Sequence, residues 1–125
     1  MWDHTMRRGK TAVRPVGHKY GAVAVERDGM RFDSKLEAAY YDHLGALINA
    51  GEVVGFLRQV PFHLPGNTRY VCDFQVFWGD GTVTFDDPKG RETDLYRLKA
   101  GQVRALYPWA TVRSLRRERG QWVAS

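Results

Sequence analysis

The segment Tyr70–Lys89, YVCDFQVFWGDGTVTFDDPK, decides the fold of this chain. Its two halves are rich in aromatic and β-branched residues, which favour strands, and they flank the short link Gly79-Asp80-Gly81. Such a link between two strand-like runs is typical of a β-hairpin. If all three link residues form the loop, Trp78 pairs with Thr82, and this pair sets the register of the hairpin.

The same register brings acidic side chains together. Counting back along the ladder places Asp73 opposite Asp87, with Lys89 on the same side of the sheet. Two carboxylates opposed across a hairpin repel each other unless a cation lies between them, so the pattern predicts a divalent-metal site beside a lysine. A two-residue turn would instead oppose Asp73 to Pro88 or Asp86, and a further alternative makes the aspartates surface residues near a turn. Asp86 is expected to face away from Asp87, toward solvent.

Length and composition describe one globular domain. The chain has 125 residues, of which 43% are hydrophobic and 26% are charged, as in an ordinary soluble protein. Its single cysteine, Cys72, cannot form an internal disulfide, and no signal peptide or long apolar run is visible. We therefore expect a cytoplasmic protein without a membrane segment, in which Cys72 is a buried structural thiol.

The positive charge lies mainly at the two ends of the chain. Lysine and arginine number 19 against 14 acidic residues, a net charge of +5. Residues 1–18 are predicted to form a flexible basic arm ahead of a single domain at 19–125. Basic clusters attract phosphate backbones without sequence discrimination, although a solvated basic face is the alternative. The cations near this end that we expect to contact DNA are Arg7, Arg8, Lys10, Arg14 and Lys19.

A helix is predicted before the acidic hairpin. Tyr20–Val25 and Met30–Phe32 are expected to form a small hairpin of their own, and Ser34 with Glu37 then fits a capping box for a helix over about 35–50. Glu37 has two candidate roles. Its carboxylate either accepts a backbone donor at the helix start or reaches Asp73 and Asp87 as a further metal ligand, and we expect one role to exclude the other in any single conformation.

The remaining patterns complete an α/β (α+β) sandwich. Residues 55–64 alternate as a strand, Thr93 caps a second helix over about 94–106, and residues 111–115 and 121–123 form a closing pair of strands. The residues of the second helix that we expect to face inward are Leu95, Leu98, Val103 and Leu106. This order predicts a sheet whose acidic hairpin lies centrally between two helices.

Glu37 on the first helix, Asp73 on one strand and Asp87-x-Lys89 on the next together resemble the PD-(D/E)xK nuclease superfamily. That resemblance implies a restriction-endonuclease-like fold, in which a central mixed β-sheet is flanked by two helices. A closer similarity, over about residues 19–112, is to small phage nucleases related to Holliday junction resolvases. The segments that carry it are Phe32-Asp33-Ser34-Lys35-Leu36-Glu37-Ala38, Gln59-Val60-Pro61-Phe62, Tyr70–Phe74, Asp86–Gly90 and Thr93–Lys99. The superfamily's namesake Pro-Asp pair is absent, because Cys72 precedes Asp73.

The resemblance implies a role for each matching residue. Asp73 and Asp87 would hold Mg²⁺ or Mn²⁺, with Glu37 and the Pro88 carbonyl as additional oxygen ligands. Lys89 would orient or help to deprotonate the attacking water and would stabilise charge on the scissile phosphate. The remaining matched positions are Gln59, which would position water, and Lys35 and Lys99, which would contact DNA phosphates.

The function implied by this resemblance is metal-dependent hydrolysis of DNA phosphodiesters at branched structures such as four-way junctions, in phage DNA recombination. A symmetric homodimer is expected because a junction must be cut twice, with Trp2, Trp109 and Trp122 as candidate contacts unless they lie in the core. The alternatives are a nuclease for linear or flap DNA and a DNA-binding module whose catalytic site has decayed. Pro88 keeps the last alternative open because proline removes a ladder donor.

Overall fold

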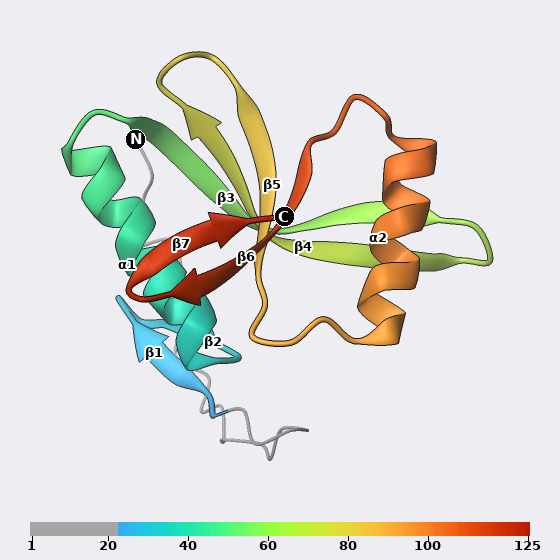
Figure 1. The fold of residues 1–125 in the computed structure, drawn as a ribbon, viewed down its shortest axis with the longest axis horizontal. Coiled ribbons are helices and arrows are strands. Elements are labelled where there is room, and N and C mark those ends of the chain that lie inside the picture. Colours follow the sequence, from blue (N-terminus) through green and yellow to red (C-terminus); the bar gives the residue numbers. More distant parts are fainter. Residues whose placement is uncertain (1–22) are drawn as a thin grey trace.

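The computed structural model describes residues 23–125, and Figure 1 shows their arrangement. The elements are β1 (Val25–Arg27), β2 (Met30–Phe32), α1 (Lys35–Asn49), β3 (Val53–Leu64), β4 (Thr68–Trp78), β5 (Val83–Pro88), α2 (Asp94–Leu106), β6 (Val112–Glu118) and β7 (Gln121–Ala124). A five-stranded mixed sheet, a two-stranded antiparallel sheet and two helices confirm the predicted α/β (α+β) class. The more specific restriction-endonuclease-like architecture stays a prediction.

The large sheet has the strand order β3-β4-β5-β6-β7. Only β5 and β6 are parallel neighbours, and α2 connects them, as expected for a parallel pair that needs a helical crossover. In Figure 1, α1 and α2 lie on opposite sides of the region where the strands converge. The acidic hairpin β4–β5 is therefore central, as the sequence predicts.

The register of the acidic hairpin is the predicted one. Phe74 pairs with Asp86, and Trp78 N donates to Thr82 O at 2.9 Å, so the loop has three residues and both two-residue alternatives are wrong. The backbone ladder stops at Phe74–Asp86. The next opposed pair, Asp73 and Asp87, therefore lies just beyond the last paired residues, where side chains replace the ladder.

The hydrophobic residues form two cores rather than one. The first lies under α1 and includes Tyr40, Phe56 and Phe74, whereas the second lies under α2 and includes Phe62 and Cys72. The change of core along β3 falls on either side of Gln59, whose φ of +55° interrupts the regular strand conformation. The predicted burial of the Cys72 thiol is confirmed, and that burial raises its pKa.

The predicted helix boundaries are confirmed, but the prediction of which residues of α2 face inward is mostly wrong. Thr93 caps α2 by accepting a hydrogen bond from Tyr96 N, and Val103 is buried as predicted. Leu95, Leu98 and Leu106 are instead 60%, 60% and 50% exposed, and Tyr96 and Ala100 are buried in their place. The prediction was wrong because it ranked leucine above alanine and tyrosine, whereas small and aromatic side chains pack this helix against the sheet.

The first strand of the small hairpin extends through Arg27, beyond its predicted end at Val25. The strands of this hairpin are joined by Asp28-Gly29, with φ of +51° and +78°, as in a two-residue type I′ turn, whereas the expected link also contained Arg27. Residues 1–22, which include the predicted basic arm and the five cations near this end that are expected to contact DNA, lie outside the described residues. Within residues 23–125, no helix is long and apolar enough to cross a membrane.

Candidate active site

The candidate active site lies at the end of the β4–β5 ladder. Here the Asp73 backbone N–H donates to the Asp87 side chain, with 2.9 Å between N and Oδ1. The predicted proximity of the two aspartates is confirmed, although one carboxylate binds the other residue's backbone. A carboxylate that accepts a backbone N–H is held in a fixed orientation, so Asp87 is positioned by β4 as well as by its own strand.

Asp87 has one satisfied and one unsatisfied oxygen. Its side chain is almost fully buried, and within the described chain Oδ2 has no hydrogen-bond partner. Burial raises the pKa of Asp87 to about 6, while Lys89 and the Asp73 backbone lower it. Buried carboxylate oxygens are rarely left unpaired, so this atom has room for a partner such as a proton, a cation or a water.

Glu37 caps the helix as predicted and turns its second carboxylate oxygen toward Gln59. Its Oε1 accepts the Asp33 backbone N–H at 3.0 Å, and Ser34 Oγ reciprocally accepts the Glu37 N–H at 3.1 Å. Its Oε2 faces the other way, 3.4 Å from Gln59 Nε2. One carboxylate thus caps the helix and contacts Gln59 through different oxygens, whereas its role as a metal ligand stays a prediction.

The Glu37 and Asp73 carboxylates also influence each other's protonation. Burial, and then the Asp73 charge, raise the pKa of Glu37 to about 7. Burial likewise raises the pKa of Asp73, whereas the Lys89 charge opposes that increase. Desolvated acidic groups close together favour a protonated state or a bound cation, and such perturbed carboxylates are typical of functional sites.

Gln59 joins the helix to the sheet at this site. Its side-chain nitrogen lies 3.2 Å from Asp73 Oδ1 and also reaches Glu37 Oε2. The positive φ of Gln59 is unusual for a residue other than glycine, and strained backbone of this kind persists where the surrounding structure enforces it. The Gln59 amide thus bridges two of the predicted carboxylates, and its role in positioning water stays a prediction.

Lys89 lies next to both aspartates without a close ion pair. Its charge lowers the pKa of Asp73 and of Asp87, yet within residues 23–125 no carboxylate oxygen lies within 4.0 Å of its Nζ. Instead Nζ lies 5.0 Å from the centre of the Tyr96 ring. The Tyr96 ring on α2 thus holds the Lys89 amine beside the carboxylates by a cation–π contact.

Pro88 does not disturb the strand that carries the site. Phe85 N donates to Thr111 O at 2.8 Å and Lys89 N donates to Leu115 O at 2.8 Å, so alternate N–H groups of β5 face β6. A donor at Pro88 would face β4 instead, where the ladder has already ended at Phe74–Asp86. The proline therefore removes no ladder bond, and the doubt that it raises about strand pairing is resolved.

Two contributors to the site were missed by sequence reasoning. Arg58 lies with Nη2 3.5 Å from Glu37 Oε2 and packs its guanidinium over the Phe32 ring at 4.0 Å. Tyr96, buried on α2, is the aromatic support of Lys89. Arg58 could have been found from the sequence because it is next to Gln59. Tyr96 could not, because the neighbouring leucines of α2 are more apolar and were expected to fill the inward face.

Other predicted residues lie elsewhere or have other partners. Asp86 is fully buried, which makes the expectation of solvent exposure wrong. Its carboxylate accepts two bonds from Arg113, both at 2.8 Å, and one from the Tyr40 hydroxyl at 2.5 Å. Lys99 donates to the carbonyl of Arg69 at 3.1 Å, and Lys35 is exposed at the start of α1.

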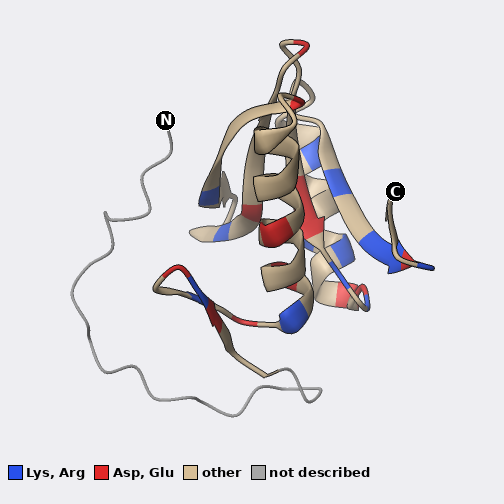
Figure 2. Cartoon of the chain, turned by 90° about the vertical axis from the view of Figure 1, so that its left-hand side faces the viewer, with Lys and Arg blue, Asp and Glu red and all other residues tan. Residues whose placement is uncertain are grey.

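The two described tryptophans with a predicted dimer role differ in exposure. Trp109 is 71% exposed, whereas Trp122 is half-buried and packs against Tyr40 with 4.9 Å between ring centres. Trp122 therefore packs against the first core with part of its surface still exposed. In Figure 2, acidic segments lie in the middle of the fold and also at loop tips above and below it, and basic residues are spaced along the strand leading to the C-terminal end.

The donor set of the site was tested against a divalent metal. Among residues 23–125, no three histidine, cysteine, aspartate or glutamate side chains are grouped closely enough to enclose an ion by themselves. Mg²⁺ does not require such a cage, since it is commonly held by one or two carboxylates together with waters and substrate phosphates. The pair Asp73 and Asp87, with one orphaned buried oxygen, fits that mode of binding.

The chain belongs to the family described as "Protein of unknown function (DUF1064)", whose profile matches residues 17–119. The match spans both helices, the acidic hairpin and β6 and ends before β7, and it includes Glu37, Gln59, Asp73, Asp87 and Lys89. Neither a curated protein nor a solved structure matches the chain.

Proposed function

We propose that this member of the DUF1064 family is a metal-dependent endonuclease that hydrolyses DNA phosphodiesters. The observation that carries the proposal is the Asp87 carboxylate, which is buried and fixed by the Asp73 backbone yet leaves one oxygen without a partner in the described chain. A folded protein rarely retains such an atom without a functional reason.

Asp73 and Asp87 would hold Mg²⁺ or Mn²⁺, with the Glu37 carboxylate and the Pro88 carbonyl as further oxygen donors at the margin of the site. When bound, the cation supplies Lewis-acid polarisation of a phosphate oxygen and a lower pKa for an attacking water. Hard oxygen donors of this type suit both ions.

The protein's own groups would orient the reactants. Lys89, held on the Tyr96 ring and free of a close ion pair in the described chain, has N–H donors available for an oxygen of the attacked phosphate. Gln59 fixes the Glu37 and Asp73 carboxylates relative to each other through its amide. Arg58 adds positive charge on the α1 side of the same cluster.

Hydrolysis would form one bond from the water oxygen to phosphorus and break one phosphorus–oxygen ester bond. One water proton passes to the leaving alkoxide, which becomes a hydroxyl end. The other leaves the new phosphate monoester end for solvent. No oxidant or reductant is required, and the balance needs only water and a group that can accept a proton.

The preference for branched DNA rests on the resemblance to junction resolvases and on the net charge of +5. Cutting a four-way junction symmetrically would require two sites, hence a homodimer. The main basic candidates among the described residues are Lys35 and the exposed cations of β6, since Arg113 is committed to Asp86.

A second candidate is a DNA-binding module of the same fold without catalysis. The position of the Gln59 amide favours it, because an amide donor already bridges Glu37 and Asp73 without any ion. The two candidates differ in their need for metal, since a binding module would retain DNA equally well in EDTA.

The test is cleavage of an end-labelled four-way junction beside a linear duplex of matching sequence, with Mg²⁺, Mn²⁺ or EDTA. We expect metal-dependent nicks that are lost in Asp87→Asn, and paired symmetric nicks on the junction alone would identify a resolvase. Equal cutting of the duplex would indicate a general nuclease. DNA binding without cleavage under every metal condition would contradict the proposal and favour the binding module.

A further inference from the structure

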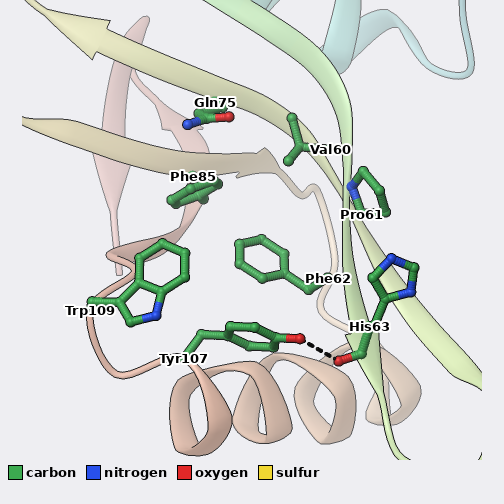
Figure 3. A pocket seen from close by; sticks show the side chains of 8 residues that line it. All are labelled: Val60, Pro61, Phe62, His63, Gln75, Phe85, Tyr107 and Trp109. Carbon is green, nitrogen blue, oxygen red and sulfur yellow. Dashed lines mark hydrogen bonds between the residues drawn. The ribbon is translucent and has the colours of Figure 1, made fainter.

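A cavity of about 270 Å³ opens between the β3–β4–β5 sheet and the segment that follows α2. Figure 3 shows its lining, with Gln75 and Phe85 at one side, Phe62 in the middle, and Tyr107 and Trp109 at the other side. No lysine, arginine, aspartate or glutamate of the described chain lines it. The cavity therefore suits an uncharged, flat occupant better than a phosphate or an ionised metabolite.

Four aromatic rings form a closed set of contacts around this cavity. Phe62 lies with its ring centre 4.9 Å from Phe85 and 5.2 Å from Tyr107, and Trp109 lies 6.4 Å from Phe85 and 5.9 Å from Tyr107. The Tyr107 hydroxyl donates to the His63 carbonyl at 2.7 Å, which fixes that ring. The rings are thus held in place before any ligand binds, which lowers the entropic cost of binding.

Trp109 is the exposed member of this set. Its side chain is 71% exposed, whereas Phe62 and Phe85 are each only 5% exposed. Because this indole is already exposed beside the cavity, its face is available for stacking without any rearrangement of the core. The Gln75 side-chain amide makes no hydrogen bond within the described chain. It therefore offers a donor and an acceptor for the edge of a bound ring.

The cavity lies next to the candidate active site along both central strands. Gln75 and Phe85 are paired across the hairpin, and they are two residues from Asp73 and Asp87 respectively. Two strand residues span about 7 Å, so a ligand in the cavity would lie one short step from the acidic pair. A single molecule could place a charged group at the aspartates and a neutral ring in the cavity.

We propose that this cavity binds an unpaired base of the DNA strand, next to the phosphate that lies at Asp73 and Asp87. The inference rests on the proposed function, since it assumes that the acidic pair receives a DNA phosphate. A base has a flat neutral ring with hydrogen-bonding edges, and stacking of bases on aromatic side chains accepts all four bases. The volume is near the lower limit of about 300 Å³ for small-molecule sites, which favours one ring system over a larger ligand.

An unpaired base is favoured over a paired one because only a base outside the helical stack can enter an aromatic cavity. The aromatic cavity would therefore select a narrower class of DNA than the acidic pair does. It specifies DNA that has an unstacked nucleotide beside the cut, as at a bulge, a flap or a junction whose central base pairs have opened. Fully paired duplex would leave the cavity empty or would require the cost of extruding a base.

The test compares three labelled duplexes that differ at one position, which carries an unpaired base, an unpaired abasic residue or no extra nucleotide. Binding is measured by fluorescence anisotropy with the full chain in EDTA, and again with Asp87→Asn in Mg²⁺, so that no cleavage occurs. We expect the unpaired base to bind more tightly than the abasic residue by roughly 5- to 140-fold, the range for stacking one base on an aromatic ring.

Trp109→Ala should bring that ratio close to one, and Trp109→Phe should retain most of it. Leu98→Ala removes an equally exposed apolar side chain from α2 outside the cavity and should leave the ratio unchanged. The inference is overturned if Trp109→Ala keeps the full ratio, or if the wild-type protein does not distinguish a base from an abasic residue. It is also overturned if sedimentation shows a dimer that Trp109→Ala dissociates, because a second copy would then cover the cavity.

The outcomes for binding and for cleavage are separable. A ratio that depends on Trp109, found in a protein that never cleaves DNA, would support the base pocket while contradicting the endonuclease proposal. Metal-dependent cleavage with no difference between base and abasic substrates would do the reverse.

Discussion

Asp86 and Asp87 are neighbours in the chain, both are almost fully buried, and their surroundings are opposite. Asp86 is saturated, since Arg113 and the Tyr40 hydroxyl together give its carboxylate three hydrogen bonds. Asp87 receives one backbone donor and leaves Oδ2 without a partner in the described chain. The comparison teaches that burial alone does not distinguish the two carboxylates, whereas the presence of an unsatisfied oxygen does.

The largest expected effect concerns the saturated aspartate. Asp86→Ala should lower the free energy of unfolding by about 3–5 kcal/mol, because it leaves Arg113 and Tyr40 without their partner inside the protein. Urea denaturation monitored by circular dichroism measures this change. Asp87→Ala is the matched control, and a larger loss of stability in that variant would break the contrast between the two residues.

The second prediction concerns the effect of metal binding at Asp73 and Asp87 on stability. Mg²⁺ or Mn²⁺ at about 100 times its dissociation constant should raise the free energy of unfolding by about 2.7 kcal/mol, provided that the ion binds only the folded state. Thermal melts across a metal titration, with EDTA as reference, would record it. Asp87→Asn should abolish the increase, and Asp86 variants that remain folded should retain it. A wild-type melting temperature independent of both ions would argue against a metal site.

The third prediction concerns pH in the absence of metal. Because the pKa of Asp87 is raised to about 6 and that of Glu37 to about 7, the folded state binds more protons than the unfolded state between pH 4 and 7. The free energy of unfolding in EDTA should therefore fall as pH rises through this range. The loss is about 1.4 kcal/mol for each pH unit by which folding raises the pKa of a carboxyl group. Above pH 7, Asp87→Asn should be more stable than wild type by about 1–3 kcal/mol.

Denaturation midpoints measured at several pH values in EDTA would check this dependence. The slope should become shallower in Asp87→Asn and in Glu37→Gln. A stability that instead rises between pH 4 and 7 in wild type, with an unchanged slope in both variants, would show that these carboxylates are already stabilised as anions.

The smallest expected change in stability is at Lys89. Lys89→Ala removes a partly exposed amine that contacts the Tyr96 ring, and such contacts contribute about 0.5–1 kcal/mol. The same variant should lose most DNA cleavage, because the amine would stabilise charge on the attacked phosphate. Tyr96→Phe keeps the ring and should retain activity. Full cleavage by a folded Lys89→Ala protein would remove the lysine from the proposed chemistry.

Local patterns were sufficient for much of the fold. The Gly79-Asp80-Gly81 loop and its register followed from turn length and strand alternation, and both helix starts followed from Ser34 and Thr93. Capping and turn chemistry act within a few residues, so the information is present in short stretches of the chain. The inward face of α2 was not predictable in this way, because it depends on what the helix packs against.

The candidate site was predictable as a set of residues but not as an arrangement. Glu37, Gln59, Asp73, Asp87 and Lys89 were each selected from the sequence, and the structure brings them together. The simultaneous use of both Glu37 oxygens, and the supporting contacts of Arg58 and Tyr96, depend on the orientation of α1 and α2 relative to the sheet. No spacing rule contains that orientation.

The sequence by itself determined the element order, the hairpin register and the opposition of Asp73 and Asp87, because backbone periodicity and turn length set them locally. Only the tertiary structure decided which hydrogen-bond partners Asp86 and Asp87 have. Adjacent strand residues point to opposite faces, and distant segments supply the groups on each face: Tyr40 and Arg113 on one side, and Tyr96 near the other. Which carboxylate is saturated is therefore a property of packing and not of the aspartates themselves.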